Sequence, residues 1–150
     1  MMSGYFEIGI YQPKYEENIG TLMRSAYQLG ATGVFTVGKR YSRQAGDIFN
    51  IAKHVPLRHY ADMPELMSAR PDGAQLIGVE KGGEAISGFA HPKRAIYLLG
   101  AEDYGLPPEI AAQCDALVTL DAVREPMYNV AVAGSIVMYD RMCMTKTITP

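Results

Sequence analysis

Three short segments of the chain combine glycine with polar side chains of the kinds that bind and orient ligands. They run from Asn18 to Arg24 (NIGTLMR), from Gly100 to Leu106 (GAEDYGL) and from Asn129 to Ser135 (NVAVAGS). A glycine at the end of a strand lets the backbone approach a ligand closely, because no Cβ stands in the way. Open α/β sheets bind their ligands at the carboxyl ends of the strands. These segments are therefore the candidates for a binding site.

The sequence lacks the motifs of several common enzyme classes. It contains no GxxxxGK[ST] phosphate loop, no GxGxxG, no HExxH and no GxSxG. The histidines His54, His59 and His91 do not have the spacing of metal ligands, and Cys114 and Cys143 do not form a CxxC pair. We therefore expect no metal site and no disulfide, and we interpret the two cysteines as small core residues.

Apolar runs that alternate with helical patterns predict an α/β fold. Several of the apolar runs are hydrophobic on both faces, which is typical of strands in a buried parallel sheet. The chain has 150 residues, the usual size of one domain, so we expect a single domain over residues 1–150. The predicted strands are 5–10, 34–37, 75–80, 95–100 and 116–120, and the predicted helices lie near 18–30, 44–53, 63–69, 107–114 and 129–144.

The first predicted helix places an arginine away from its buried face. Asn18 is a suitable N-cap and Gly30 a suitable C-terminal stop. Gly20 and Arg24 are four residues apart, on a flank of the helix, so Arg24 projects towards a rim or a cleft. A solvated surface arginine would show the same pattern. The apolar residues that form the buried stripe are Ile19, Leu22, Met23, Ala26 and Leu29.

The last predicted helix is almost continuously apolar over residues 130–138. A helix that is apolar on all sides must be buried on all sides. In a chain this short, a subunit interface would provide that burial. Burial between the sheet and a neighbouring helix would provide it equally well, and the pattern leaves both interpretations open.

Charge and hydrophobicity limit the classes of partner. The formal net charge of −2 argues against binding nucleic acid through overall charge, although a local basic patch remains possible. No run approaches the apolar length of a membrane span, and the first residues do not resemble a secretory signal, so we expect a cytoplasmic protein. The basic cluster, which is either a solvated face or a docking surface, consists of Lys39, Arg40, Arg43, Lys53, His54, Arg58 and His59.

Taken in order, the three segments resemble the three motifs of the SpoU/TrmH-like family of SPOUT-class RNA methyltransferases. The resemblance extends over nearly the whole chain, from the first strand to the last helix. The matching residues are Asn18, Gly20 and Arg24 in the first motif, Gly100, Glu102, Gly105 and Leu106 in the second, and Asn129-Val130 in the third.

This resemblance implies a fold and an activity. The fold would be a single-domain, parallel-sheet α/β fold with a C-terminal trefoil knot. The activity would be transfer of a methyl group from S-adenosylmethionine to a ribose 2′-hydroxyl of RNA, without a metal. Because no RNA-binding domain is appended, a tRNA loop is favoured over a ribosomal site. Members of this size are homodimers whose active site lies at the interface, in agreement with an apolar C-terminal helix.

The resemblance also implies roles for individual residues. Arg24 would hold a substrate phosphate and stabilise the developing alkoxide, and Glu102 would brace the Arg24 side chain or have no role. The implied catalytic residues are Arg24, Asn18, Glu102 and Asn129. The implied cofactor contacts are Val79, Gly100, Leu120, Met127, Tyr128 and Asn129. The implied RNA contacts are Arg24, Lys39, Arg40, Arg43, Lys53 and His54.

Departures from the family pattern keep other functions open. The serine of the third motif is Met127 here, the following leucine is Tyr128, and Leu120-Asp121 replaces an Ile-Pro pair. A catalytically impaired homologue that still binds cofactor and RNA is one alternative. An unrelated α/β enzyme acting on a small nucleotide is another, and it predicts that the three motifs do not converge and that the basic cluster lies far from Gly100. A purely structural interaction domain is the least favoured.

Overall fold

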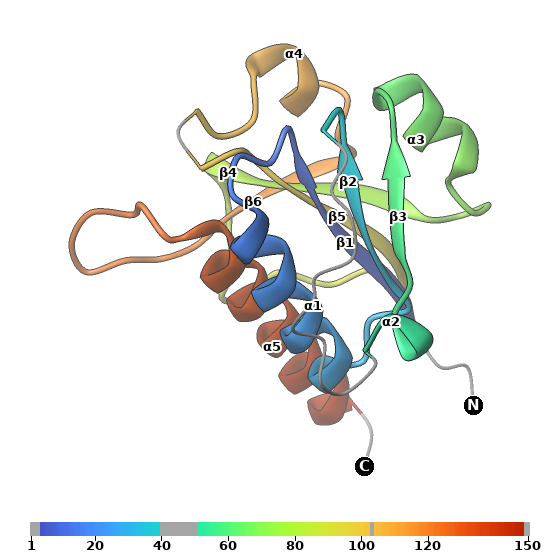
Figure 1. Ribbon diagram of the computed structural model, residues 1–150. Coiled ribbons are helices and arrows are strands. Elements are labelled where there is room, and N and C mark those ends of the chain that lie inside the picture. The colour runs from blue at the N-terminus through green and yellow to red at the C-terminus, as the bar shows by residue number, and fades with distance from the viewer. Residues whose placement is uncertain (1–3, 40–50, 103, 149–150) are drawn as a thin grey trace.

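A six-stranded sheet forms the centre of the molecule, in the order β3-β2-β1-β5-β4-β6 (Figure 1). The computed structural model describes residues 4–39, 51–102 and 104–148. All neighbouring strands are parallel, which confirms the predicted parallel α/β fold, whereas the trefoil knot stays a prediction. The strands are β1 (Tyr5–Tyr11), β2 (Gly33–Val37), β3 (Leu57–Tyr60), β4 (Gln75–Ala85), β5 (Arg94–Leu99) and β6 (Ala116–Thr119).

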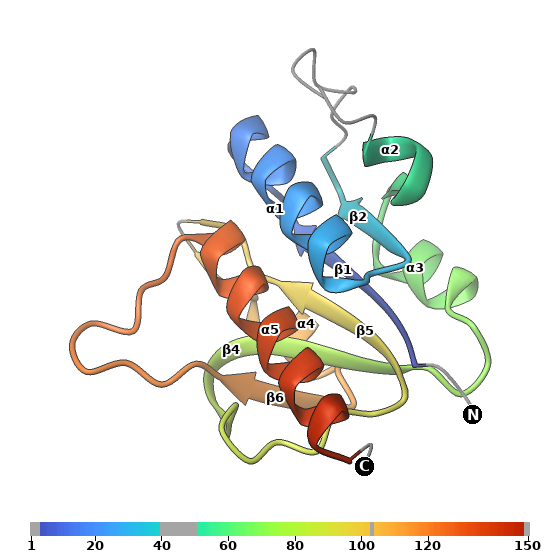
Figure 2. The same cartoon turned by 90° about the horizontal axis from the view of Figure 1, so that it is seen from below.

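Helices cover both faces of the sheet and divide the core in two (Figures 1 and 2). Successive residues of a strand point to opposite faces. Ile8 and Ile10 therefore pack under α1, α2 and α5, while Phe35 and Val37 pack under α3 and α4. The helices are α1 (Glu16–Leu29), α2 (Ile51–His54), α3 (Met63–Ala69), α4 (Pro108–Ala111) and α5 (Val130–Ile148). Most of the predicted 44–53 helix lies outside the described residues.

The start of α1 corrects one prediction. The helix begins at Glu16, so Asn18 lies in its first turn and is not the N-cap. Two acidic residues, Glu16 and Glu17, occupy that turn and interact favourably with the positive end of the helix dipole. The predicted C-terminal stop is correct, because Gly30 has φ 91° and its N–H donates to the Ala26 carbonyl oxygen. As a result, the buried Asn18 side chain is available for bonds to other segments.

Strand β3 was not predicted, because polar side chains join it to its neighbours. Its Arg58 Nη1 donates to Oε1 of the buried Glu7 on β1 at 2.6 Å. Its His59 Nδ1 lies 3.0 Å from Thr36 Oγ1 on β2. Burial, together with the hydrogen bond to Glu7, raises the pKa of Tyr5 to about 12. The sequence LRHY carries no alternating apolar pattern, and these polar pairs replace it.

Helix α5 packs closely on α1 with one face and exposes another. A Cβ added at Gly134 would lie 2.5 Å from Leu22 Cδ1, so only glycine permits this approach. On the opposite side, Val132 is 47% exposed and Tyr139 is 57% exposed. The expectation that α5 is buried on all sides is therefore wrong for the single chain. Among the described residues, no helix is both long and apolar enough to cross a membrane.

A buried arginine fixes the second half of α5. Arg141 is only 4% exposed, yet its donors are satisfied. It donates to the carbonyl oxygens of Pro92 at 2.7 Å and Lys93 at 2.9 Å, and to the Tyr97 hydroxyl at 3.0 Å. Its guanidinium carbon also lies 4.9 Å from the centre of the Phe6 ring. These contacts join α5 to β5 and to the segment that precedes it.

The hydrogen bonds continue from Tyr97 to His91, and the donor and acceptor of each bond can be assigned. Because the Tyr97 hydroxyl accepts from Arg141, its own hydrogen is available for His91 Nδ1 at 2.7 Å. His91 Nδ1 then acts as an acceptor, so the ring hydrogen is on Nε2, which lies 2.7 Å from Asp140 Oδ2. This assignment makes His91 neutral. Protonation of Nδ1 would remove the bond from Tyr97.

We predict that His91 makes folding stability depend on pH. Burial lowers the pKa of His91 below its ordinary 6.5, although Asp140 opposes the shift. As the pH falls below 6.5, His91 becomes protonated in the unfolded chain but not yet in the folded chain. The free energy of unfolding therefore falls as the pH falls. Urea denaturation at about pH 7.5 and about pH 5.5 should show this loss, and His91→Gln should reduce it. The substitution should also cost about 1–3 kcal/mol at the higher pH.

An equal loss of stability on acidification in the His91→Gln variant and the original chain would contradict this prediction. Acid destabilisation would then come from carboxylates alone.

Candidate active site

A cavity of about 530 Å³ opens at the carboxyl ends of β5 and β6, beside the middle of β4. This is the edge at which parallel α/β sheets bind ligands, and the volume suits a small organic molecule. The cavity walls come from residues 79–81, 99–102, 104–105, 119–120 and 126–130, with Ala133 of α5. All the residues expected to contact a cofactor line it, namely Val79, Gly100, Leu120, Met127, Tyr128 and Asn129.

Two glycines shape the loop that follows β5. A Cβ at Gly100 would lie 2.2 Å from the carbonyl carbon of Gly105, closer than any side chain permits. Gly105 itself has φ 65°, a backbone conformation that favours glycine. Its N–H donates to the Ala101 carbonyl oxygen at 2.9 Å. The loop therefore folds back on the end of β5 and presents main chain to the cavity.

Glu80 holds this loop in place, and the sequence analysis did not identify it. Its Oε2 accepts a hydrogen bond from the Leu106 N–H at 2.6 Å, and its carbonyl oxygen accepts from Thr119 Oγ1 at 2.6 Å. Thr119 Oγ1 in turn accepts from the Gly83 N–H at 2.6 Å. Glu80 and Thr119 thus join β4, β6 and the loop after β5, three of the segments that line the cavity. A carboxylate at the carboxyl end of an apolar strand was the available signal.

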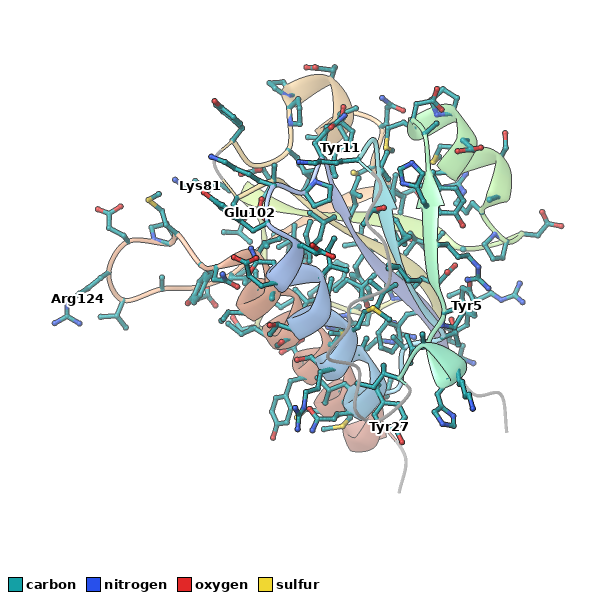
Figure 3. All side chains as sticks on the ribbon, viewed as in Figure 1. Tyr5, Tyr11, Tyr27, Lys81, Glu102 and Arg124 are labelled. Carbon is teal, nitrogen blue, oxygen red and sulfur yellow. The ribbon has the colours of Figure 1, made fainter. Side chains whose placement is uncertain are left out.

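Side-chain hydrogen bonds connect the three motifs. Asn18 Nδ2 donates to Glu102 Oε1 at 3.0 Å, and Asn129 Nδ2 donates to Asn18 Oδ1 at 3.0 Å. Asn129 Oδ1 accepts from the Ala131 and Val132 N–H groups at 2.9 and 3.1 Å, so it caps α5. Figure 3 shows Glu102 near the start of α1, with Lys81 beside it. Three of the four expected catalytic residues are therefore adjacent.

Arg24 is the expected catalytic residue that lies elsewhere. The described hydrogen bonds of Glu102 join it to Asn18 and to the Lys14 N–H at 2.9 Å, whereas the sequence suggested Arg24 as its partner. Arg24 is exposed on α1, six residues after Asn18 and so about 9 Å further along the helix axis. It does not belong to the described cavity lining. Of the four expected catalytic residues, Arg24 is thus the one that does not line the described cavity or bond to Glu102 through a described hydrogen bond.

The described residues of the basic cluster are divided between the carboxyl ends and the amino ends of the strands. Lys39 follows the carboxyl end of β2 and is exposed at the cavity edge. Lys53 and His54 are exposed on α2, which precedes β3 and lies at the amino ends of the strands (Figure 1). Arg40 and Arg43 lie outside the described residues. The expected convergence of the motifs is present, but the cluster does not surround the cavity.

Metal and thiol chemistry receive little support from the geometry. Across the described parts of the chain, no group of three or more His, Cys, Asp and Glu residues is arranged to hold a metal ion. Burial raises the pKa of the Cys114 thiol to about 11. At neutral pH this thiol is therefore protonated and a poor nucleophile.

Comparison with known proteins decides the family. The sequence profile of the SpoU rRNA Methylase family matches residues 5–139. The chain belongs to this family. The resemblance inferred from the three motifs is thus confirmed, and the match extends from β1 into α5.

This SpoU-family chain has similar proteins in both sequence and structure. The tRNA (cytidine(34)-2′-O)-methyltransferase of Beijerinckia indica subsp. indica is 28% identical over 141 residues, covering 87% of this chain and 86% of the relative. A structure described under the 2-OH methylation of C/U34 on tRNA has a TM-score of 0.79 at 22% identity, covering 95% and 98% of the two chains. The SpoU methyltransferase AviRb from Streptomyces viridochromogenes, in complex with AdoMet, has a TM-score of 0.79 at 21% identity, covering 98% and 60%. The solved structures share the fold.

We predict that Gly100→Ala damages the cavity of this SpoU-family chain. The added methyl group must displace the Gly105 backbone and with it the bond from Leu106 to Glu80. Such overpacking costs about 1–3 kcal/mol, which urea denaturation would measure. Gly88→Ala is the control, because no atom lies within 4 Å of a Cβ at Gly88, and its φ of 89° adds only backbone strain. An unchanged stability of Gly100→Ala would show that the close contact at Gly100 is unimportant.

Proposed function

We propose that this chain transfers a methyl group from S-adenosylmethionine to a ribose 2′-hydroxyl of tRNA. The observation that carries the proposal is the convergence of three motifs on one cavity, with Asn18, Glu102 and Asn129 joined by hydrogen bonds. The Beijerinckia relative, similar over 87% of this chain, is named for cytidine 34 of tRNA. We therefore assign nucleotide 34, in an exposed tRNA loop, as the target.

The cavity fits the cofactor in shape and polarity. Buried Leu99, Leu120 and Val130 supply apolar walls of the kind that suit adenine. Gly100 and Gly105 line the cavity and have no side chains, so at these positions only main chain can contact a ligand. Val79 and Tyr128 complete the proposed contacts. S-adenosylmethionine supplies an electrophilic methyl group on a sulfonium, so the chain's own task is to position and activate the hydroxyl.

Arg24 is proposed to act as a clamp. A guanidinium is always protonated in proteins, so it is a poor candidate for a general base. It can hold a substrate phosphate through paired hydrogen bonds and stabilise the alkoxide that develops as the hydroxyl loses its proton. Because Arg24 lies away from the cavity of its own chain, we assign this role to Arg24 of the partner subunit.

A homodimer through α1 and α5 would supply that second subunit. The two helices lie side by side on one face of the sheet (Figures 1 and 2). Tyr27 on α1 is 46% exposed, and Val132 and Tyr139 on α5 are 47% and 57% exposed. Exposed apolar side chains on adjacent helices are the usual composition of a subunit interface. Burying them in a two-fold interface would also complete the burial that the apolar α5 sequence indicates.

We predict that Tyr139→Arg weakens the dimer without unfolding the chain. An exposed side chain can be replaced at little cost to the fold, but a charge would be desolvated in the interface. Analytical ultracentrifugation should show monomers, and methyl transfer should fall together with the dimer. Val123→Arg is the control, because Val123 is 97% exposed on the 121–128 loop, away from these helices. A fully dimeric Tyr139→Arg variant would place the interface elsewhere.

The activity itself is tested by titrating S-adenosylmethionine into the protein in a calorimeter and counting methyl groups transferred to tRNA that lacks ribose methylation. We expect binding and transfer, with no transfer to a tRNA that carries 2′-deoxyribose at nucleotide 34. Absence of cofactor binding would overturn the proposal. Binding without transfer to any RNA would favour the catalytically impaired homologue, which Met127 in place of serine suggests.

Arg24→Ala should reduce kcat roughly 10²–10³-fold, the usual effect of removing one group that stabilises an oxyanion. Cofactor affinity should not change, because Arg24 does not line the described cavity. Arg24→Lys keeps the charge but loses the paired hydrogen bonds, so its kcat should lie between those of the other two proteins. Full activity of Arg24→Ala would exclude the proposed clamp.

A further inference from the structure

The cavity has a buried interior and an exposed rim. Leu99, Leu120 and Val130 are each at most 6% exposed and form the interior. Tyr104 and Met127 line the same cavity, yet they are 87% and 74% exposed. A ligand enclosed by the interior would bury its contacts, as binding pockets do. The rim residues therefore face the outside of the cavity, where a second, larger molecule approaches.

We propose that Tyr104 is the stacking platform for the base of the nucleotide that is methylated. This assignment rests on the proposed function, since it concerns the RNA substrate of the same site. Proteins recognise bases in RNA loops by splaying them out and stacking them on aromatic side chains. The ring of Tyr104 is the most exposed aromatic surface of the cavity lining, and stacking would cover it.

The backbone beside Tyr104 is held firmly. Gly105 turns with φ 65°, and its N–H donates to Ala101 at 2.9 Å. The next N–H, of Leu106, donates to the Glu80 carboxylate at 2.6 Å. Tyrosine has only two side-chain torsions, so a ring on such a loop loses little freedom when a base stacks on it. These bonds fix the backbone that follows Tyr104 at the rim of the cavity.

The charges on the rim agree with a nucleotide as the occupant. Lys81 lines the cavity and is exposed, and Figure 3 shows it near Glu102, two residues before Tyr104. An ammonium and an aromatic ring on the rim of one cavity provide a contact for a phosphate and a contact for a base, the combination found in single-strand binding sites. The stacked base would leave its ribose directed at the cavity, where methyl transfer takes place.

The test compares three substitutions of Tyr104 in the full chain. Tyr104→Phe keeps the ring, Tyr104→Leu keeps a hydrophobic side chain without a ring, and Tyr104→Ala removes both. We expect Phe to behave like the original chain, while Leu and Ala lower kcat/KM for tRNA roughly 5- to 150-fold, the worth of one stacked base. The dissociation constant for S-adenosylmethionine, measured by calorimetry, should not change.

A spectroscopic readout tests stacking without catalysis. An anticodon stem-loop with 2-aminopurine at nucleotide 34 loses fluorescence when that base stacks on an aromatic ring. The complex with the original chain or Tyr104→Phe should therefore be dimmer than the complex with Tyr104→Leu.

Several results would overturn the assignment. If Leu matches Phe in kcat/KM and in fluorescence, the ring does not stack. If cofactor affinity falls in parallel with activity, Tyr104 contacts the cofactor. In either case the original chain still methylates tRNA, so the proposed function stands. If the original chain transfers no methyl group to tRNA, the proposed function fails and the assignment with it.

Discussion

A chain of side-chain hydrogen bonds from Asn129 through Asn18 to Glu102 is the interaction on which the site depends. It joins residues 111 and 84 positions apart in sequence, so it can form only when α1, α5 and the loop after β5 have all reached their places. Asn129 uses its remaining oxygen to cap α5, and Glu102 uses its second oxygen to hold the start of α1. Local structure and site geometry therefore form together. Loss of Asn129 or Glu102 would leave a polar group of the buried Asn18 without its partner, which costs more than the bond itself.

The cavity and the proposed arginine clamp differ in whether one chain is enough to form them. The cavity is made at the carboxyl edge of one sheet, and the folding of a single chain completes it. Arg24 lies about 9 Å along α1 from Asn18 and does not line the described cavity, and in our proposal a second chain brings it to the site. The exposed Tyr27 and Tyr139 on the outer face of α1 and α5 give such an association a hydrophobic driving force. In the proposed dimer, assembly and catalysis are coupled, because each cavity would receive its arginine from the other chain.

The sequence predicted those features whose cause is local. Buried apolar runs gave five of the six strands, because in a parallel sheet the pattern is visible in each strand alone. Strand β3 was missed because Arg58 and His59 find their partners on other strands. The motifs led to the cavity residues but not to Glu80. Glu80 matters because its carboxylate accepts a hydrogen bond from the Leu106 N–H, and that contact exists only in the folded chain. The position of Arg24 relative to the cavity likewise depends on three-dimensional packing, which helical periodicity does not contain.

The inner wall of the cavity around Gly100 and Gly105 is largely main chain. Main-chain groups are common to all amino acids. Substitutions near the cavity would therefore change few of the main-chain contacts available to a cofactor. Substitutions on the rim, in contrast, alter side chains that project outwards, such as Tyr104 and Met127. A lineage with this architecture can exchange one RNA target for another without rebuilding its cofactor site. Such an arrangement agrees with a fold shared at 22% identity and a TM-score of 0.79, and it makes the rim the natural starting point for redirecting the enzyme to a new substrate.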